Sequence, residues 1–466
     1  MQPFTVLLAF AAVFFVEANQ YYTDEWGRYE SEIYRIVGDM SGKESVESNS
    51  YSTGINDFGI SFEYTPEKKT VHNLRPEDIE IVGALGDSIT AGTGENANTI
   101  AGIAIQYRGY VWTAGGEESL ETSLTIPNIL RQFNPSVKGY SMGLGVGFAP
   151  REDEDWFNVA IPGARAKDMT SQVNELIRRM KADNKTSFEH DWKLISIFIG
   201  GNDLCALDRD PIGASPEVYR DEIEAALDIM HEHLPRALVQ IIQIMEIYLL
   251  PQVPDGYNAS QFCHIFQNLA CSHVVESVND PEALQILKEK NWEYQRLVSE
   301  LVSSGKYDTK DDFTIVLQPF FEETVLPYTE DGLVDATFFA PDCFHFSSKG
   351  HAMGALNLWN NMMEPVGEKT TVWEVTDLKC PSKEQPYIHT RMNHLASSPA
   401  PSTTVKTTIA ISTCPELTCK SVPDWAIGVI CALAVLAALF LVAFIVVGQS
   451  EPPNSKINAK CQSYDF

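Results

Sequence analysis

Positive charge is scarce in this sequence. The 466 residues include 34 lysines and arginines against 63 aspartates and glutamates, which gives a formal net charge of −29. Proteins that bind nucleic acids neutralise phosphates with clusters of lysine and arginine, and the same residues attract anionic membranes. The composition therefore argues against nucleic acid as a partner and offers no basic surface for an anionic membrane.

Motifs that bind metal ions are also missing. The chain has no Cys-x-x-Cys pairs with metal-ligand spacing and no His-Glu-x-x-His sequence. His231 and His233 are two residues apart, so a helix would not place both rings on one face. We therefore expect no metal site.

Seven cysteines precede an apolar segment near the carboxyl terminus: Cys205, Cys263, Cys271, Cys343, Cys380, Cys414 and Cys419. In an oxidising compartment they should form disulfides, and one of the seven should remain unpaired. Cys263/Cys271 and Cys414/Cys419 are plausible local pairs, although sequence alone cannot fix the connectivity. Asn184 and Asn258 stand in Asn-x-Ser/Thr sequons, which fits exposure to the secretory pathway.

Two apolar runs predict how the chain meets the membrane. Residues 1–18 resemble a signal peptide, with an apolar run and small Ala18 at the cleavage site but no charged start. Residues 426–447 are apolar or small and long enough to cross a bilayer, with Trp425 at the edge. We expect a single-pass type I protein of the plasma membrane, with a transmembrane helix at 425–447 and a cytoplasmic tail at 448–466.

The extracellular part reads as one domain with flanking segments. Residues 19–70 have no sustained period and predict an irregular leader. From Ile79, apolar strands alternate with amphipathic helices. The strands are expected at 79–85, 194–199, 237–247 and 313–317, and the helices at 168–180, 216–233, 281–302 and 350–363.

This alternation predicts an α/β layer fold with a mainly parallel sheet over residues 71–365, and an active site at the carboxyl ends of the strands. Residues 366–424, rich in Ser, Thr and Pro towards their end, predict a stalk.

Three small polar clusters follow apolar segments. Ser88 comes directly after a strand, on a turn that would expose its hydroxyl, although a helix cap is an alternative. Asn202 follows the next strand and could donate a hydrogen bond to an oxyanion, although Asn-Asp also favours turns. Gly163 could offer an unobstructed backbone N–H, although on its own a plain turn before the helix at Asp168 explains it better.

A fourth cluster supplies a base. Asp342 stands three residues before His345, close enough on one turn for the carboxylate to hold the imidazole in one tautomer. His351, on the following helix, is a weaker candidate. The clusters occur in the order nucleophile, N–H donor, amide donor and Asp/His pair, and together they predict a hydrolase.

The same clusters resemble the GDSL, or SGNH, hydrolase superfamily and, within it, the membrane-associated phospholipase B family. The similar segments are 71–79, 84–92, 107–109 with Gly115-Gly116, 125–130, 199–205 and 342–347. Ile89 stands where the family name has leucine, a mild change. The mammalian form carries tandem catalytic repeats, whereas this chain has one copy.

The resemblance implies a three-layer α/β fold and a reaction without cofactor or metal. It implies that Ser88 is the nucleophile, His345 the base and Asp342 its orienting acid. Ser88 N–H, Gly163 N–H and the Asn202 amide would form the oxyanion hole. The implied substrates are acyl esters of phospholipids and lysophospholipids. An esterase for other lipid or small acyl esters, such as retinyl or acetyl esters, and a non-catalytic tethered ectodomain remain alternatives.

Overall fold

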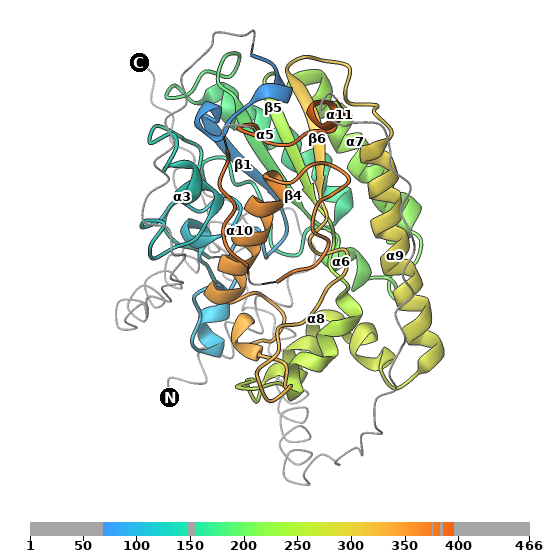
Figure 1. Ribbon diagram of the computed structural model, residues 1–466. Helices are drawn as coiled ribbons and strands as arrows, with labels where there is room; N and C mark the ends of the chain where they lie inside the picture. The colour runs from blue at the N-terminus through green and yellow to red at the C-terminus, as the bar shows by residue number, and fades with distance from the viewer. Residues whose placement is uncertain (1–68, 147–154, 375, 383–384, 396–466) are drawn as a thin grey trace, which may run out of the picture. The chain divides into compact units, whose positions relative to one another are not determined.

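The computed structural model describes residues 69–146, 155–374, 376–382 and 385–395 (Figure 1). The expected signal peptide, nearly all of the leader, the transmembrane segment at 425–447, the tail and the Cys414/Cys419 pair lie outside these ranges. Within them, no helix is long and apolar enough to cross a membrane.

A four-stranded parallel sheet forms the centre of the domain. Its strands are β1 (Ile81–Gly86), β4 (Lys193–Phe198), β5 (Ala237–Ile242) and β6 (Phe313–Gln318), in the order β1-β4-β5-β6. Every residue of β1, β4 and β5 is buried, which is typical of a parallel sheet covered on both faces. The predicted α/β fold with a parallel sheet is confirmed.

Helices cover the sheet. Figure 1 shows α10 in front of the sheet and α9 along one side. Helix α5 packs on β1 and α7, α9 packs on α7 and β6, and α10 packs on β6 and α3. Two of these helices begin where serine or aspartate precedes proline: Ser215 accepts a hydrogen bond from Val218 N, and Asp280 caps α9. The bounds of these helices are α3 (Ile126–Leu130), α5 (Met169–Ala182), α7 (Pro216–His233), α9 (Pro281–Ser303) and α10 (Ser348–Met362), and α8 spans Cys263–Ser277 with a kink at Cys271.

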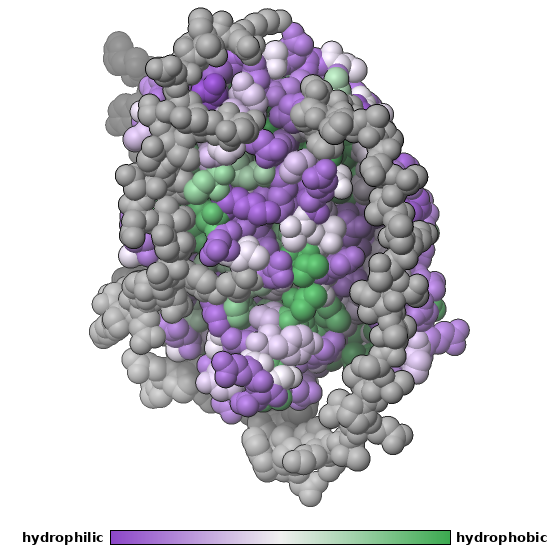
Figure 2. Space-filling view, in the orientation of Figure 1, coloured by the Kyte–Doolittle hydropathy of each residue, from purple (hydrophilic) through white to green (hydrophobic). Residues whose placement is uncertain are grey.

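Short elements complete the described chain. They are η1 (Val71–Asn73), η2 (Pro76–Asp78), η3 (Ile100–Ala104), β2 (Ile105–Gln106), η4 (Arg108–Tyr110), β3 (Gly145–Val146), η5 (Ala166–Asp168), α6 (Gly201–Leu204), η6 (Ile247–Asp255), η7 (Ala336–Phe338) and α11 (Arg391–Leu395). The third predicted strand is too long, because β5 ends at Ile242 and the chain turns into η6, which contains two prolines. Hydrophilic side chains dominate the coloured surface in Figure 2, with a small hydrophobic group near the middle of the view.

The direction in which the chain connects the strands of the sheet indicates where a ligand-binding site lies. On one side of β1, isolated parallel bridges join Ile81 to Lys138 and Ala84 to Asn158. On its other side β1 pairs with β4. The chain therefore leaves β1 in one direction and returns on the opposite side, which makes a topological switch point at the carboxyl ends of β1 and β4, where α/β proteins bind ligands.

Two disulfides differ from the local pair expected from sequence. Cys205 bonds to Cys271, and Cys263 bonds to Cys343. The expected Cys263/Cys271 pair is wrong, because both residues lie on α8, where eight residues span about 12 Å at 1.5 Å per residue. A disulfide needs Cα atoms within about 7 Å. Cys380 carries an exposed free thiol.

The structure describes part of the segment expected to form the stalk, residues 366–374, 376–382 and 385–395. Trp373 is buried, and its ring lies 5.3 Å from those of Phe321 and Phe346. Asparagines on α10 hold the segment in place: Asn357 donates to Glu374 O, and Asn360 donates to Asp377 O. The described residues from 366 to 395 therefore pack on the domain. Residues 374 and 376–379 show no periodicity in sequence, because they form no helix or strand and side chains of α10 bind their backbone instead.

Replacement of Trp373 tests whether this segment belongs to the domain. Trp373→Ala should lower the free energy of unfolding by about 3–5 kcal/mol, because it leaves a cavity among three phenylalanine rings. Urea denaturation of the full chain measures this loss. Met392→Ala, in the same segment but exposed, should change stability by less than about 0.5 kcal/mol. Equal stabilities for the two variants would contradict the assignment.

Candidate active site

The turn after β1 presents Ser88. Gly86 has φ +157°, and a Cβ there would lie 2.3 Å from Phe198 O, so only glycine fits. The Gln172 side chain of α5 accepts from Gly86 N at 2.9 Å and donates to Gly86 O at 2.8 Å. The strand end is thus fixed on both sides. Asp87 accepts from Ile89 N at 3.0 Å, which closes the turn around the serine.

Ser88, His345 and Asp342 form a continuous chain of hydrogen bonds. His345 Nε2 lies 2.8 Å from Ser88 Oγ, and His345 Nδ1 lies 2.6 Å from Asp342 Oδ2. Asp342 Oδ1 also accepts from the backbone N–H groups of Phe344 and His345, each at 3.0 Å. The carboxylate therefore fixes both the ring and the turn that carries it. This is the arrangement in which a histidine can accept a serine proton.

The neighbouring carboxylate of Asp342 makes the His345 imidazole more basic. Burial alone would lower the pKa of His345, but the charge of Asp342 and its hydrogen bond raise it above the ordinary value. Burial alone would raise the pKa of Asp342, but His345 and the two backbone donors hold it below the ordinary value. Burial raises the pKa of Asp87 to about 6, against the opposing charge of His345. Asp342 is therefore the ionised partner of the pair.

A disulfide anchors the histidine turn. Cys343, between Asp342 and His345, has φ +55°, a conformation that non-glycine residues seldom adopt. Its sulfur bonds to Cys263 of α8, and its carbonyl accepts from Gln267 Nε2 at 2.7 Å. These two attachments keep the unusual turn in place. The sequence signal was the cysteine inside the Asp-Cys-Phe-His cluster, although nothing in the sequence named its partner.

Asn202 and Gly163 lie side by side. Asn202 Nδ2 donates to Ala164 O at 3.0 Å, which leaves its second N–H for another acceptor. The turn that carries Gly163 is joined to the serine strand, because Ile161 N donates to Gly86 O at 3.1 Å. Within the described residues, the backbone N–H groups of Ser88 and Gly163 have no hydrogen-bond acceptor. The arrangement thus offers three unused donors around one edge of the sheet.

Gly163 is required by conformation rather than by space. Its φ is +79°, and a Cβ there would meet nothing within 4 Å. Gly200, before Asn202, differs: φ is +125° and a Cβ would lie about 3 Å from the Tyr219 ring. Tyr219 donates to Ile199 O at 2.9 Å and stacks on Tyr294. The backbone ahead of Asn202 is therefore held closely against α7.

Sequence reasoning missed Asp203 as the link between these two turns. Its carboxylate accepts from Ala166 N at 3.0 Å and from Arg165 Nε at 3.2 Å. Arg165 also binds Asp210 at 2.8 Å. Burial raises the pKa of Asp203 to about 7, although its hydrogen bonds and Arg165 oppose the shift. Asp203 positions the Gly163 turn against Asn202 without facing the serine itself.

Arg108 is a second missed support. It is buried, and its guanidinium donates to Ala160 O at 2.8 Å and to Asn158 O at 3.3 Å. Asn158 Nδ2 in turn donates to Thr90 O at 2.8 Å, two residues after Ser88. This network fixes the segment before Gly163 beside the serine turn. Its sequence signal was Arg108 in Tyr-Arg-Gly, one of the segments that carry the family resemblance.

Neither His351 nor His231 hydrogen-bonds to the serine in this structure. His351 is buried in α10, where Trp112 N–H points to its Nδ1 at 3.5 Å. Burial, and then the charge of His345, lower the pKa of His351 to about 3, so this ring is neutral. His231, on α7, contacts Thr309. Among the described residues no group of three or more His, Cys, Asp or Glu side chains is arranged to hold a metal ion.

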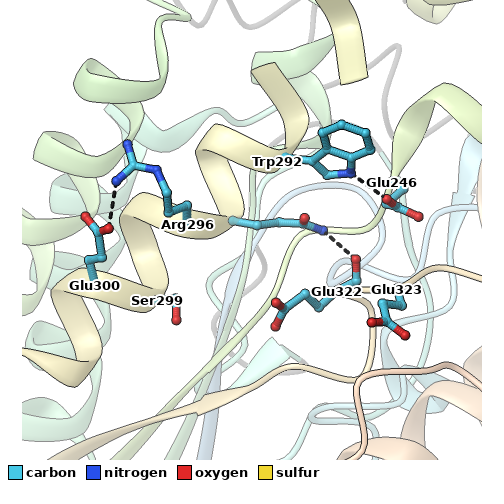
Figure 3. Close-up of a pocket in the computed structure, with 8 residues that line it drawn as sticks. Glu246, Trp292, Arg296, Ser299, Glu300, Glu322 and Glu323 are labelled. Carbon is cyan, nitrogen blue, oxygen red and sulfur yellow. Dashed lines mark hydrogen bonds and ion pairs between the residues drawn. The ribbon is translucent and has the colours of Figure 1, made fainter. Parts of the chain in front are cut away.

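A separate cavity of about 370 Å³ lies between α9 and the segments that follow β5 and β6 (Figure 3). Trp292 Nε1 donates to Glu246 at 2.7 Å, Gln295 donates to Glu322 O at 3.2 Å, and Arg296 pairs with Glu300 at 2.7 Å. None of the residues expected in the hydrolase site lines it. Three pairs of its lining residues bind one another in this way, and the cavity is separate from Ser88, Asp342 and His345.

Comparison with known protein families matches the part of the chain that contains these site residues. The family model of the GDSL-like Lipase/Acylhydrolase matches residues 82–358, from β1 into α10. This chain belongs to the GDSL-like lipase/acylhydrolase family. Ser88, Gly163, Asn202, Asp342 and His345 all lie inside the matched region.

Curated relatives agree with this family. "Phospholipase B1, membrane-associated" from mouse and from rat is 44% identical over 329 residues, and the human protein is 43% identical over 331 residues. Each match covers 70% of this chain but 22% of the relative, so this GDSL-family chain spans about a fifth of their length. An extracellular lipase from Streptomyces rimosus aligns at 14% identity over 60% of this chain and 98% of its own, with a TM-score of 0.29, too low to support a conclusion.

The Asp342–His345 pair can be tested without any substrate. Asp342→Asn should lower the pKa of His345, because the favourable charge is lost while burial remains. Titration of the imidazole signals by NMR measures the shift. Asp335→Asn is the matched control, since Asp335 binds Lys349 and Thr337 and not His345. If the pKa of His345 were the same in wild type and Asp342→Asn, the ion pair would not govern it.

Proposed function

We propose that this chain is a serine esterase that releases fatty acids from phospholipids and lysophospholipids. The observation that carries the proposal is the hydrogen-bonded chain from Ser88 Oγ through His345 to Asp342. The catalytic residues would be Ser88, His345 and Asp342, and the oxyanion donors Ser88 N–H, Gly163 N–H and Asn202 Nδ2. No metal or cofactor takes part in these steps.

In the first half-reaction, Ser88 Oγ attacks the ester carbonyl while its proton passes to His345 Nε2. The three donors stabilise the negative charge that develops on the carbonyl oxygen. Collapse of this intermediate breaks the bond to the alcohol, which takes the proton from His345. A fatty-acyl ester on Ser88 remains, and the lysophospholipid or glycerol-containing alcohol departs.

In the second half-reaction, water attacks the acyl-serine and gives a proton to His345. The same donors stabilise the oxyanion, and His345 returns the proton to Ser88 Oγ as the fatty acid leaves. Asp342 stays ionised and compensates the positive charge of the ring in both halves. Because the base must be neutral, the rate should increase with pH through the raised pKa of His345.

The phospholipid substrate follows from the relatives. The curated proteins that match this chain are called phospholipase B1, and the serine, glycine, asparagine and histidine that the family reaction needs are all present. Other lipid or small acyl esters are the second candidate, because related folds accept many acyl groups. A panel of esters separates these two.

We also propose the cellular location and membrane topology expected from the sequence. A signal peptide at 1–18, a transmembrane helix at 425–447 and a tail at 448–466 would leave the catalytic domain outside the plasma membrane. Two disulfides among the described residues suit an oxidising compartment. Asn184 and Asn258, the proposed glycosylation sites, are both exposed. The relatives are named membrane-associated, which agrees with a membrane tether.

Loss of the nucleophile tests the esterase. Wild-type protein incubated with phosphatidylcholine should release fatty acid, lysophospholipid and glycerophosphocholine, and Ser88→Ala should release none above background. A fluorophosphonate probe should label wild type and not Ser88→Ala. Turnover that survives in Ser88→Ala would exclude this serine as the nucleophile. Faster hydrolysis of acetyl or retinyl esters than of phosphatidylcholine would favour the second candidate, and absence of labelling would favour a non-catalytic ectodomain.

Removal of one oxyanion donor tests the role of Asn202. Asn202→Ala should reduce kcat by about 10²- to 10³-fold with little change in KM, because the amide acts mainly on the transition state. Steady-state kinetics on one phospholipid gives both constants. Asn174→Ala, an exposed asparagine on α5, is the control and should leave both unchanged. A kcat for Asn202→Ala equal to that of the control would remove Asn202 from the site.

A further inference from the structure

Helix α8 exposes apolar side chains on the side opposite its buried one. The buried side carries Cys263, Gln267 and, at a kink where the backbone leaves the helical conformation, Cys271. At about 100° per residue, Ile265 and Leu269 fall on the opposite side together with Phe262, the residue that precedes the helix. These three side chains are 40%, 51% and 61% exposed. We call them the outer face of α8. Three neighbouring large apolar side chains in solvent are costly unless something covers them.

The position of α8 connects its outer face to catalysis. The Cys263–Cys343 disulfide joins the start of α8 to the turn between Asp342 and His345. The Cys205–Cys271 disulfide joins its later part to the end of α6, the helix that carries Asn202. Figure 1 shows α6 and α8 together at one end of the sheet. The helix is therefore tied to the turn of the base and to the turn of an oxyanion donor.

The charge pattern indicates which surface this face meets. Residues 256–275 contain no Asp, Glu, Lys or Arg, whereas 21% of the whole chain is charged. Twenty residues of average composition would carry about four charges. A chain of net charge −29 is repelled by anionic surfaces, and a stretch without acidic side chains of its own is where it can approach lipid with the fewest carboxylates. The exposed Asp255, just before this stretch, lies 4.0 Å from His264 and is the carboxylate nearest to it in sequence on that side.

We propose that the outer face of α8 is a lipid-docking surface, which inserts Phe262, Ile265 and Leu269 into the interface of the phospholipid aggregate that supplies the substrate. The inference rests on the proposed esterase for its substrate. Long acyl esters stay in a bilayer, so the enzyme must meet that bilayer with the end of the sheet where Ser88 lies. The two disulfides keep the docking helix and the catalytic turns in one rigid unit.

A comparison of two substrates tests the docking surface. The full chain is assayed on phosphatidylcholine vesicles and on a water-soluble butyryl ester, both as purified and after enzymatic removal of N-glycans, because the sequon at Asn258 lies four residues before Phe262. The variant Phe262→Ser/Ile265→Ser/Leu269→Ser should lower the vesicle rate at least about tenfold and change the soluble-ester rate by less than about twofold. Phe262→Leu/Ile265→Leu should keep the wild-type ratio of the two rates. Ile286→Ser/Met392→Ser, exposed apolar residues elsewhere, should keep it as well.

A second measurement does not require turnover. Ser88→Ala protein is irradiated on phosphatidylcholine vesicles that carry a diazirine in the acyl chain, and labelled peptides are identified by mass spectrometry. Labels within 256–275 that disappear in the triple serine variant support docking. An unchanged ratio of rates, or labels that avoid this stretch, would overturn the inference. The inference would also be overturned if the triple serine variant only converted a dimer into a monomer, because the outer face of α8 would then join two copies of the chain. Labelling at 256–275 without hydrolysis of either ester would reject the esterase and retain the docking surface.

Discussion

The hydrogen bond between Ser88 Oγ and His345 Nε2 is the constraint on which the site depends. It joins residues 257 positions apart, so both turns must be fixed to within a few tenths of an ångström by the rest of the fold. The serine turn is fixed by β1, by Gln172 and by a glycine that no other residue could replace. The histidine turn has no strand beneath it. A disulfide, a carboxylate that accepts three hydrogen bonds, and the ring of Trp373 against Phe346 hold it instead.

Buried polar groups likewise position the turns that carry Gly163 and Asn202. Asp203 connects the Asn202 turn to the Gly163 turn, and Arg108 connects the segment before Gly163 to the residues after Ser88. Burying such groups costs free energy unless every hydrogen bond is made. That cost confers specificity, because a displaced turn would leave a carboxylate or guanidinium unsatisfied. The proposed oxyanion donors would consequently be organised before any substrate arrives, which is the condition under which such donors lower a barrier most.

The sequence predicted the parts that local patterns control. Buried parallel strands read as continuous apolar runs, and helices such as Pro216–His233 begin at a cap followed by proline, so their positions could be predicted. The order of the small polar clusters predicted which strand ends would meet. Contacts between distant segments could not be predicted in this way. No local pattern reveals the partner of Cys343, the hydrogen bond from Ala166 to Asp203 or the packing of Trp373. The prediction that Cys263 pairs with Cys271 failed because one helix holds these two cysteines too far apart.

The disulfides of α8 explain how this helix stays attached although its outer face is apolar. The residues that it buries are two cysteines, a glutamine, a valine and a serine, so it gains little from hydrophobic burial, and an apolar outer face would normally destabilise its docking. The two disulfides keep α8 from detaching from the domain, whatever side chains its exposed face carries. The outer face is then free to be selected for something other than folding. A surface that stays apolar, lacks charge for twenty residues and cannot move independently of His345 and Asn202 is suited to presenting lipid to the serine, and this requirement accounts for both disulfides at once.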